Sequence, residues 1–429
     1  MSARKDLAGG LESHRIPIDQ PAKNILYITF DGILQPLGYS QVARVVTGLG
    51  LRGYRYTLLS LERSADLADV AQVESVRTRL ASSGVGWITQ QADLVHSIRS
   101  SAAAVASMTR AALRIADAQN IELIHARGYQ SAGVARVVRL LRGVPYLFDA
   151  RGCWIEERAK PGDWFSGPKR YALGKGLERE LYTSACAIVA LTTLHATDIR
   201  AEYPGQNGPI EVIPTCTDYD DFELRRSRPD KPTRSATLSP DLVETLRNKT
   251  VIGVVGSLNS SYLVDAALKL TAYATRESRN IRLLVLSRQA TEYLRIIETA
   301  GIPTETVTYA ESRHEDIAEW LQWIDWGFLL LPEVAAKRGS MPTKLGEFFA
   351  TGVRPLAHGC NSEMISWVTR SGSGLVLDQV DDGSLKWAAS QLSRPGDFAA
   401  LQRARDITEP HFGLKQGLDR YGQLLASLL

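Results

Sequence analysis

Several features are scarce in this sequence, and each absence excludes a class of protein. Its 429 residues include only four cysteines, Cys153, Cys186, Cys216 and Cys360, and none stands in a C-x-x-C or other metal-type spacing. This excludes a disulfide-rich secreted domain, and we expect reduced thiols. No apolar run is long enough to span a bilayer. The net charge of +3 gives no sign of a nucleic-acid-binding surface. Residues 1–22 lack the apolar core of a secretory signal, so we expect a disordered tail and a cytoplasmic protein.

Apolar strands and helices alternate along the first half of the chain. The apolar runs predict strands at Asn24–Phe30, Arg55–Leu61, Glu122–Ala126, Pro145–Asp149, Ala187–Leu191 and Ile210–Ile213. Between them we expect a loop at Asp31–Gly38, a helix from there to about Leu51, and helices at Val95–Gln119 and Ser131–Leu141. Unbroken apolar strands joined by helices are typical of a parallel sheet covered on both faces.

The alternation pauses at Glu223–Thr250, which is rich in Arg, Ser, Pro and Lys, and then begins again. The second half predicts strands at Val251–Val255, Ile281–Leu286, Glu305–Tyr309, Trp326–Leu331, Arg354–Ala357 and Gly374–Leu377. We therefore expect an α/β protein with two doubly wound, Rossmann-like domains that face each other across a cleft. The predicted divisions are a tail at 1–22, domains at 23–223 and 250–405 with a linker at 224–249, and a C-terminal helix at 406–429 that packs back on the first domain.

One short segment carries the strongest chemical signal. Ser340 is a natural N-cap, Pro342 suits a first helical turn, and Gly352 suits the end of the helix. The free N–H groups of such a helix, together with Lys344, predict an anion site. Glu347 lies one turn further along, where its carboxylate could accept a hydrogen bond from a polyol such as ribose. A nucleotide-sugar site is one interpretation, and a capped amphipathic helix with a solvated Lys and Glu is the other.

A second candidate anion site follows the first strand. Gly38 is expected to open a helix there, so that Tyr39 and its neighbours offer backbone N–H groups to phosphates. The alternative is a tight turn that requires glycine for its backbone angles.

Four motifs occur in the order found in one enzyme family. They are D-G-I-L-Q-P-L-G-Y-S-Q from Asp31, F-D-A-R-G-C-W-I-E-E from Phe148, V-I-P-T-C-T-D-Y-D-D-F from Val212 and P-T-K-L-G-E from Pro342. Together they resemble the family 4 retaining glycosyltransferases of GT-B fold, and the resemblance extends from about Asn24 to Leu429. It implies transfer of a sugar from a nucleoside-diphosphate sugar, UDP- or GDP-linked, with retention of configuration and without a metal.

The chain also departs from the family pattern. Glu347 matches the second acid of the family's E-x7-E pair, but Gly339 stands in place of the first. The G-R-L-x-x-x-K motif that binds the diphosphate reads G-S-L-N-S-S-Y from Gly256, so both cations are missing. The candidates for the cations that bind the diphosphate in their place are Arg288, Lys337 or Arg338, and Lys344. The residues expected to bind the donor are Gly38, Tyr39, Ser257, Arg288, Ser340, Pro342, Thr343, Lys344 and Glu347.

The resemblance also indicates residues for catalysis, the acceptor and the sugar. Arg151, Arg288, Lys344 and Glu347 are the catalytic candidates. Arg151 takes the place of a family His; it is expected to hold a phosphate, an acidic acceptor or a carboxylated sugar, or else to pair with Asp149, Glu156 or Glu157. Candidates for the acceptor or sugar are Asp31, His125, Trp154 and Glu363. Their structural alternatives are a loop cap, a strand-end histidine, a core tryptophan and a plain helix N-terminal acid.

We therefore expect a glycosyltransferase that extends a glycan, a polysaccharide or a lipid-linked acceptor. One alternative is a catalytically silent GT-B protein that binds glycan or supports a partner, and a lesser one is a nucleotide-sugar 2-epimerase. A basic and aromatic segment suggests peripheral contact with the inner face of a membrane, with a solvated basic helix as the equal alternative. It comprises Arg158, Lys160, Lys169, Arg170, Lys175, Arg179, Trp164, Phe165, Tyr171 and Leu177. The acid-rich stretch at Asp218–Asp221 is expected to be capping or linker structure rather than a metal site.

Overall fold

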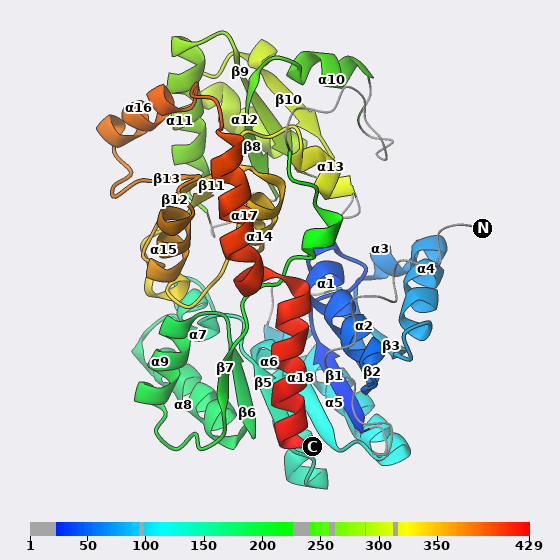
Figure 1. Cartoon of the computed structure of the whole chain (residues 1–429). Coiled ribbons are helices and arrows are strands. Elements are labelled where there is room, and N and C mark those ends of the chain that lie inside the picture. The colour runs from blue at the N-terminus through cyan, green and yellow to red at the C-terminus, as the bar shows by residue number, and fades with distance from the viewer. Residues whose placement is uncertain are drawn as a thin grey trace, which may run out of the picture. The chain divides into compact units, whose positions relative to one another are not determined.

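The computed structural model describes residues 23–93, 98–225, 238, 240–256, 262–287, 289–311 and 316–429. These residues form two compact units (Figure 1). The first unit holds the described residues up to Ile213 together with Lys415–Leu429, and the second holds Pro214–Leu414. The chain therefore leaves the first unit once and returns to it for its last helix.

The described residues of the first unit contain a seven-stranded parallel sheet in the order β3-β2-β1-β4-β5-β6-β7. Its strands are β1 (Asn24–Thr29), β2 (Arg55–Glu62), β3 (Gly86–Gln91), β4 (Leu123–Arg127), β5 (Tyr146–Asp149), β6 (Ala187–Ala190) and β7 (Ile210–Val212). Its helices are α1 (Pro36–Gly38), the π-helical turn η1 (Tyr39–Ala43), α2 (Arg44–Leu51), α3 (Ser64–Leu67), α4 (Val70–Ala81), α5 (Ile98–Gln119), α6 (Gly128–Arg142), α7 (Trp154–Glu157), α8 (Pro168–Ser184), α9 (Thr193–Glu202) and α18 (Leu414–Leu428). The order of strands is that of a doubly wound sheet.

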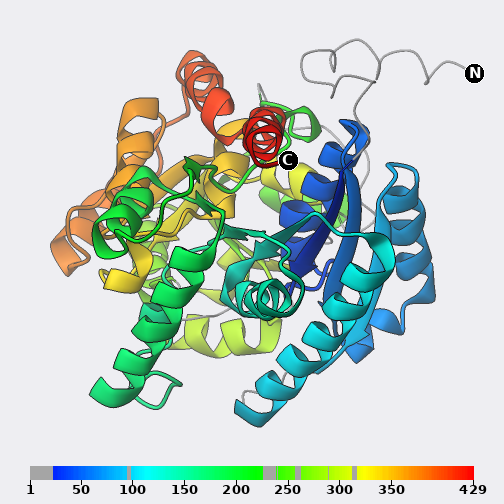
Figure 2. The ribbon, with the colours of Figure 1, turned by 90° about the horizontal axis from the view of Figure 1, so that it is seen from below.

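Alternate residues of β1 show how the two faces of this sheet are covered. Leu26 and Ile28 are buried in a core built with residues of α5 and α6. Tyr27 points to the opposite face, where it contacts His125, which in turn contacts Tyr421 of α18. The view from below shows helices on both faces of the strands (Figure 2).

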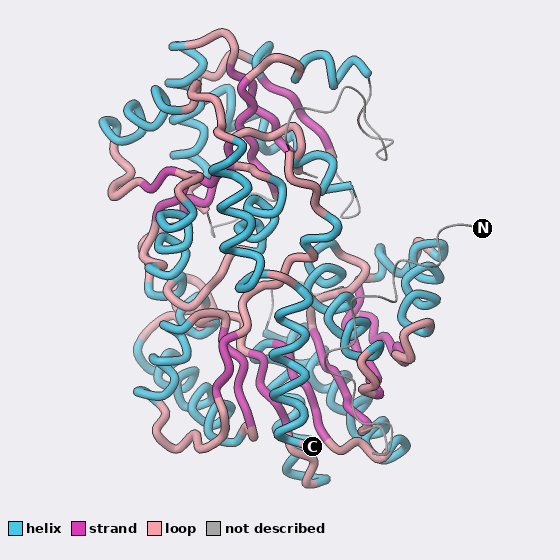
Figure 3. The backbone as a smooth tube through the Cα atoms, in the orientation of Figure 1, coloured by secondary structure: helices cyan, strands magenta, loops and turns pink. Residues whose placement is uncertain are grey.

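The described residues of the second unit contain a six-stranded parallel sheet in the order β10-β9-β8-β11-β12-β13. Its strands are β8 (Thr250–Val255), β9 (Ile281–Leu286), β10 (Val307–Ala310), β11 (Trp326–Leu330), β12 (Arg354–His358) and β13 (Leu375–Val376). Its helices are α10 (Pro240–Leu246), α11 (Val264–Glu277), α12 (Ala290–Thr299), α13 (Ile317–Leu321), α14 (Thr343–Thr351), α15 (Ser362–Ser371), α16 (Asp382–Gln391) and α17 (Phe398–Phe412), with short 3-10 turns η2 (Tyr219–Asp221), η3 (Thr304–Thr306) and η5 (Ala335–Lys337). The alternation of helix and strand is clear in Figure 3.

The predicted fold class is confirmed, and the last helix packs on the first unit as expected. Tyr54 donates a hydrogen bond to the carbonyl of Gly422 at 2.9 Å, and Arg52 pairs with Asp419 at 2.7 Å. A side-chain carbon at Gly48 of α2 would lie 2.4 Å from Leu418, so the two helices meet at a glycine. The C-terminal helix is therefore an integral part of the first sheet's covering layer.

Some elements were not predicted. Strand β3 has the sequence G-W-I-T-Q-Q and lies at the edge of the first sheet, where most of its side chains are partly exposed. Helix α4 buries only Val76 and Leu80 among its residues. Neither segment has the long apolar run on which the sequence prediction depended.

Candidate functional site

Helix α14 begins one residue after Pro342, which occupies the N-cap position. The expected N-cap, Ser340, does not cap the helix: its hydroxyl donates to the carbonyl of Lys337 at 3.0 Å. A proline cap leaves the first-turn N–H groups without a side-chain acceptor. The other end is as predicted, because Gly352 ends the helix with a left-handed φ of 81°.

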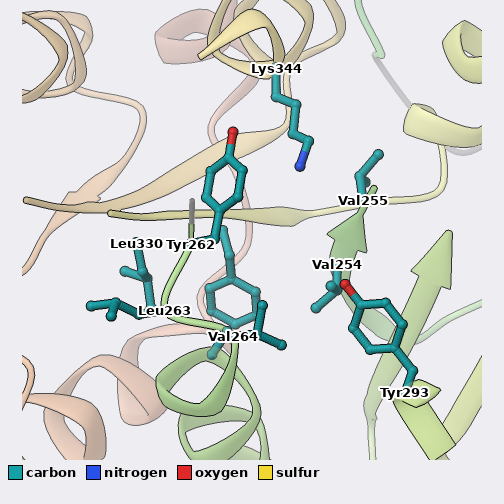
Figure 4. Close-up of a pocket in the computed structure, with 10 residues that line it drawn as sticks. Val254, Val255, Tyr262, Leu263, Val264, Tyr293, Leu330 and Lys344 are labelled. Carbon is teal, nitrogen blue, oxygen red and sulfur yellow. The ribbon is translucent and has the colours of Figure 1, made fainter. Parts of the chain in front are cut away.

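Lys344, in the first turn of α14, reaches a small pocket at the end of β8 (Figure 4). Its ammonium lies 4.4 Å from the centre of the Tyr262 ring. A side-chain carbon at Gly256, which follows β8 with a φ of +105°, would lie 3.1 Å from Nζ. The rest of the pocket wall is apolar and includes Val254 and Phe328. The ammonium is thus brought to the carboxyl edge of the second sheet, where such folds bind ligands.

Burial shifts the pKa values of Lys344 and Glu347 in opposite directions. Burial lowers the pKa of Lys344 to about 8, and the charge of Glu347 opposes that shift. Burial also raises the pKa of Glu347 to about 7, and the charge of Lys344 opposes it. Glu347 is 9% exposed. Strongly perturbed groups at the ligand edge of a sheet are typical of a functional site.

The other candidates of the second unit lie in several environments. Ser257 and Arg288 fall outside the described residues. Lys337 is buried, and Arg338 beside it is exposed. Thr343 is the first residue of α14 and Lys344 the second, so both contribute N–H groups to the open end of the helix.

A buried asparagine, not singled out from the sequence, fixes the loop ahead of α14. The side chain of Asn361 accepts a hydrogen bond from the N–H of Met364 at 2.9 Å and so caps α15. Its amide nitrogen donates to the carbonyl of Ser340. Glu363 lies next in that helix, with one carboxylate oxygen 3.8 Å from Nε2 of His411. The predicted donor loop and the Glu363 helix are therefore joined.

In the first unit, charged residues meet at the carboxyl edge of β1, β4 and β5. Asp149, fully buried, lies 3.0 Å from Arg151, 3.7 Å from Arg127 and 3.6 Å from His125. Tyr421 of α18 donates to it at 3.1 Å. Burial alone would raise the pKa of Asp149, but Arg151, the nearby His125 and Arg127 together hold it well below its ordinary value.

Two arginines of this network differ in their contacts and in their exposure. Arg127, which was not predicted as a site residue, is 6% exposed and donates to Asp31 at 2.9 Å. Arg151 forms an ion pair with Asp149, which was the structural alternative expected for it. Its Nε is buried and has no hydrogen-bond partner among the described residues. The Arg151 side chain as a whole is 15% exposed, so it is the more accessible of the two arginines. Arg127 was missed because it ends an apolar strand whose other residues indicate only a core.

His125 and Trp154 take their structural alternatives. His125 is 0% exposed, and burial lowers its pKa despite the opposing charge of Asp149. A fully buried imidazole cannot contact a substrate in this conformation, which corrects the expectation that it faces one. Trp154 stacks on Tyr129 with ring centroids 5.6 Å apart and packs edge-on against Phe165 at 5.4 Å. It is partly buried against the core.

The glycine loop after β1 folds differently from the prediction. The helix starts at Pro36, and the N–H of Tyr39 donates to the carbonyl of Gln35 at 2.8 Å, so it is not open to an anion. A side-chain carbon at Gly38 would lie 2.1 Å from the carbonyl oxygen of Gly32. Gly38 is thus required by close packing, because its φ of −64° is an ordinary helical value.

A buried carboxylate that the sequence prediction overlooked holds this loop. Glu62, the last residue of β2, accepts from the N–H of Ile33 at 2.9 Å and from the N–H of Leu34 at 3.4 Å. Burial raises the pKa of Glu62, against the effect of these hydrogen bonds. Its position at the end of an apolar strand was the one available signal.

The remaining predictions concern metals and membranes. Asp218 caps η2, as expected, by accepting from the N–H of Asp220 at 3.4 Å. No cluster of three or more His, Cys, Asp or Glu side chains suited to a metal occurs in the described part of the chain. Among the helices formed by those residues, none has the length and apolar character needed to cross a membrane.

Comparison with known proteins relates part of the chain to one protein family. Residues 40–216 match the family described as a glycosyl transferase 4-like domain. This segment, which makes up most of the first unit, is similar to that family. No curated protein matched the sequence.

Solved structures of low identity share the fold of this chain. Sucrose-phosphate synthase from Thermosynechococcus elongatus is 14% identical, covers 95% of this chain and 99% of its own, and superposes with a TM-score of 0.68. Anabaena HepE, solved with UDP and glucose, is 13% identical with coverages of 94% and 100% and a TM-score of 0.64. A glycosyltransferase from Rickettsia africae is 14% identical with coverages of 95% and 99% and a TM-score of 0.63.

Proposed function

We propose that the second unit binds the diphosphate of a nucleoside-diphosphate sugar at the first turn of α14. The single observation that carries this proposal is the ammonium of Lys344, which is held at the carboxyl edge of the sheet in an apolar pocket. None of the ion pairs within the described residues neutralises it there. A cation placed in this way, beside open helix N–H groups, is suited to stabilise the negative charge that develops on a leaving diphosphate.

Glu347 is proposed to read the ribose of the donor. It lies one turn after Lys344 on the same helix. It is nearly buried, so its carboxyl group is largely shielded from solvent. A carboxylate accepts hydrogen bonds from two vicinal hydroxyls without a charge on the ligand. The structure of HepE was solved with UDP and glucose, which makes UDP the first nucleotide to test.

The first unit is proposed to bind the acceptor, a glycan, polysaccharide or lipid-linked sugar, with Arg151 as the residue that contacts an anionic group. The partly exposed side chain of Arg151 and the network around Asp149 support this assignment. Guanidinium groups suit phosphate and carboxylate because they donate two parallel hydrogen bonds. Retention of configuration, and transfer without a metal, belong to the same proposal.

Peripheral contact with an anionic bilayer is proposed for the exposed face of α8. Lys169, Arg170, Leu173 and Leu177 are exposed on that helix, which combines positive charge with apolar side chains. Lys175 does not contribute, because it pairs with Glu156 at 3.1 Å and with Glu202 at 3.3 Å. Co-sedimentation with phosphatidylglycerol vesicles, lost in a Lys169→Glu/Arg170→Glu variant, would support this contact, and equal sedimentation would refute it.

Donor turnover tests the catalytic proposal without knowledge of the acceptor. The protein is incubated with UDP-glucose and with GDP-mannose, and hydrolysis of the donor, in which water accepts the sugar and the nucleoside diphosphate is released, is followed with and without EDTA. We expect slow release from one donor that EDTA leaves unchanged and Lys344→Met abolishes. No release from any nucleotide sugar, even with acceptor glycans added, would favour the silent GT-B protein. Epimer formation from the donor alone would favour the 2-epimerase.

A further inference from the structure

The side chain that supports Lys344 is an aromatic ring rather than a carboxylate. Tyr262 lies just ahead of α11, and its ring centre is 4.4 Å from the ammonium (Figure 4). This distance is well within the range of a cation–π interaction. Tyr262 is itself one wall of the pocket at the end of β8, which Leu263 and Val254 also line, and burial raises the pKa of its hydroxyl.

The choice of an aromatic partner has a chemical consequence. A carboxylate at this place would hold the ammonium but also neutralise it, and an incoming diphosphate would have to displace that carboxylate. An aromatic face attracts a cation through its quadrupole and leaves the full positive charge available to an anion. Lys344 makes no ion pair with Glu347 in the described part of the chain, although the two are three residues apart on α14.

We propose that Tyr262 is a positioning residue that holds the Lys344 ammonium over Gly256, ready to bind the diphosphate of the donor. The proposal rests on the proposed function of Lys344 and adds a residue and a physical device to it. Gly256 completes the arrangement, since a side chain there would come within 3.1 Å of Nζ. The cation that binds the diphosphate thus comes from α14, and the residue ahead of α11 supplies its seat.

A double-mutant cycle tests this inference. The dissociation constants of UDP, GDP, ADP and dTDP are measured by calorimetry, and the tightest nucleotide is carried into the cycle. Replacing Tyr262 by Leu removes the ring and should weaken binding about tenfold, the size expected of a partly desolvated cation–π contact. In a Lys344→Met background the same Tyr262→Leu change should have less than about a twofold effect, because no ammonium remains to be positioned. Tyr262→Phe keeps the ring and should bind more tightly than Tyr262→Leu.

A matched control uses a second lysine–tyrosine pair in the same unit. Lys386 of α16 lies 5.3 Å from the ring centre of Tyr273 on α11, remote from α14 in sequence and element. Tyr273→Leu should leave the nucleotide affinity unchanged. Thermal unfolding of each unliganded variant separates loss of fold from loss of positioning. If Tyr262→Leu fails to fold, Tyr262→Met keeps the apolar volume without a ring and carries the same expectation.

The outcomes are distinguishable. Weakening of binding by Tyr262→Leu that disappears in the Lys344→Met background supports the inference. Equal weakening in both backgrounds, or none in either, overturns it while the proposed donor site stands. Failure of all four nucleotides to bind the wild type overturns the proposed function and this inference with it.

Discussion

The hydroxyl of Tyr421 donates to Oδ2 of Asp149 at 3.1 Å, across 272 positions of sequence. This bond joins the last helix of the chain to the charged network at the carboxyl edge of the first sheet. Asp149 in turn contacts Arg151, the residue proposed to meet the acceptor. The C-terminal helix therefore does more than cover the sheet, because it fixes the carboxylate that orients Arg151.

Replacing Tyr421 by Phe should lower both stability and acceptor binding. The buried carboxylate loses a hydrogen bond, which costs about 1.5–3 kcal/mol when one partner is charged. The free energy of unfolding is measured in urea, and the KM for the acceptor is measured once an acceptor is known. Tyr54→Phe, which removes a hydrogen bond to Gly422 of the same helix, is the control: it should cost about 1 kcal/mol and leave KM unchanged. Equal KM values for both variants would contradict the role given to Tyr421.

Lys344→Met should bind nucleotide more weakly while the unliganded protein becomes no less stable. The ammonium is confined in an apolar pocket that lowers its pKa, so an isosteric apolar side chain relieves a desolvation penalty. We expect an increase of about 1–2 kcal/mol in the free energy of unfolding. Thermal unfolding with and without UDP measures both effects. A variant that is strongly destabilised without nucleotide would indicate a structural lysine.

The Lys344–Glu347 pair should give the unliganded protein a stability minimum between about pH 7 and 8. The pKa of Glu347 is raised to about 7 from an ordinary 4.5, so the folded protein binds more protons than the unfolded chain between these values. Stability then falls as pH rises through this window, by up to about 3 kcal/mol. The pKa of Lys344 is lowered to about 8 from 10.5, so the sign reverses and stability recovers as pH rises above 8.

Single substitutions separate the two limbs of this profile. Glu347→Gln should remove the fall between about pH 4.5 and 7, and Lys344→Met should remove the recovery above about pH 8. Unfolding in urea is measured at intervals of pH for wild type and both variants. A wild-type profile that parallels the Glu347→Gln profile below pH 7 would show that Glu347 titrates normally.

Gly38→Ala should destabilise the first unit through a steric clash with Gly32. The added carbon would lie 2.1 Å from a backbone carbonyl oxygen, which cannot move aside as a side chain could. A loss of about 2–3 kcal/mol is expected. Gly133→Ala on α6 is the control, because no atom lies within 4 Å of the added carbon there. That change should raise stability by about 0.5–1 kcal/mol.

The elements that could be predicted from the sequence are those with long apolar strands or clear helix-end signals. Strands such as β8 and β11, and the end of α14 at Gly352, carry local signals and were predicted. Edge strand β3 and helix α4 have weak local patterns and were not. Local pattern is informative where one face is fully buried and fails where burial depends on a neighbouring element.

The site residues that could be predicted are likewise those with a local signal in the sequence. Lys344 and Glu347 follow from the helix that carries them, since their spacing is local. Tyr262 and Arg127 were missed because their interactions, with Lys344 and with Asp31, are tertiary contacts between segments that are distant in sequence. Ser340 was expected to cap α14 because its type suits the position, but Asn361 and Lys337 engage its backbone and hydroxyl instead.

The most direct test of the donor site is thermal unfolding in the presence of UDP, GDP, ADP, dTDP and CMP. It is measured for the wild type, Lys344→Met and Glu347→Ala. A nucleotide at about 100 times its dissociation constant adds roughly 2.7 kcal/mol to the free energy of unfolding. The account predicts that one nucleoside diphosphate stabilises the wild type and that both substitutions reduce the shift. Stabilisation that both substitutions leave unreduced, or none with any of the nucleotides, would contradict a donor site on α14.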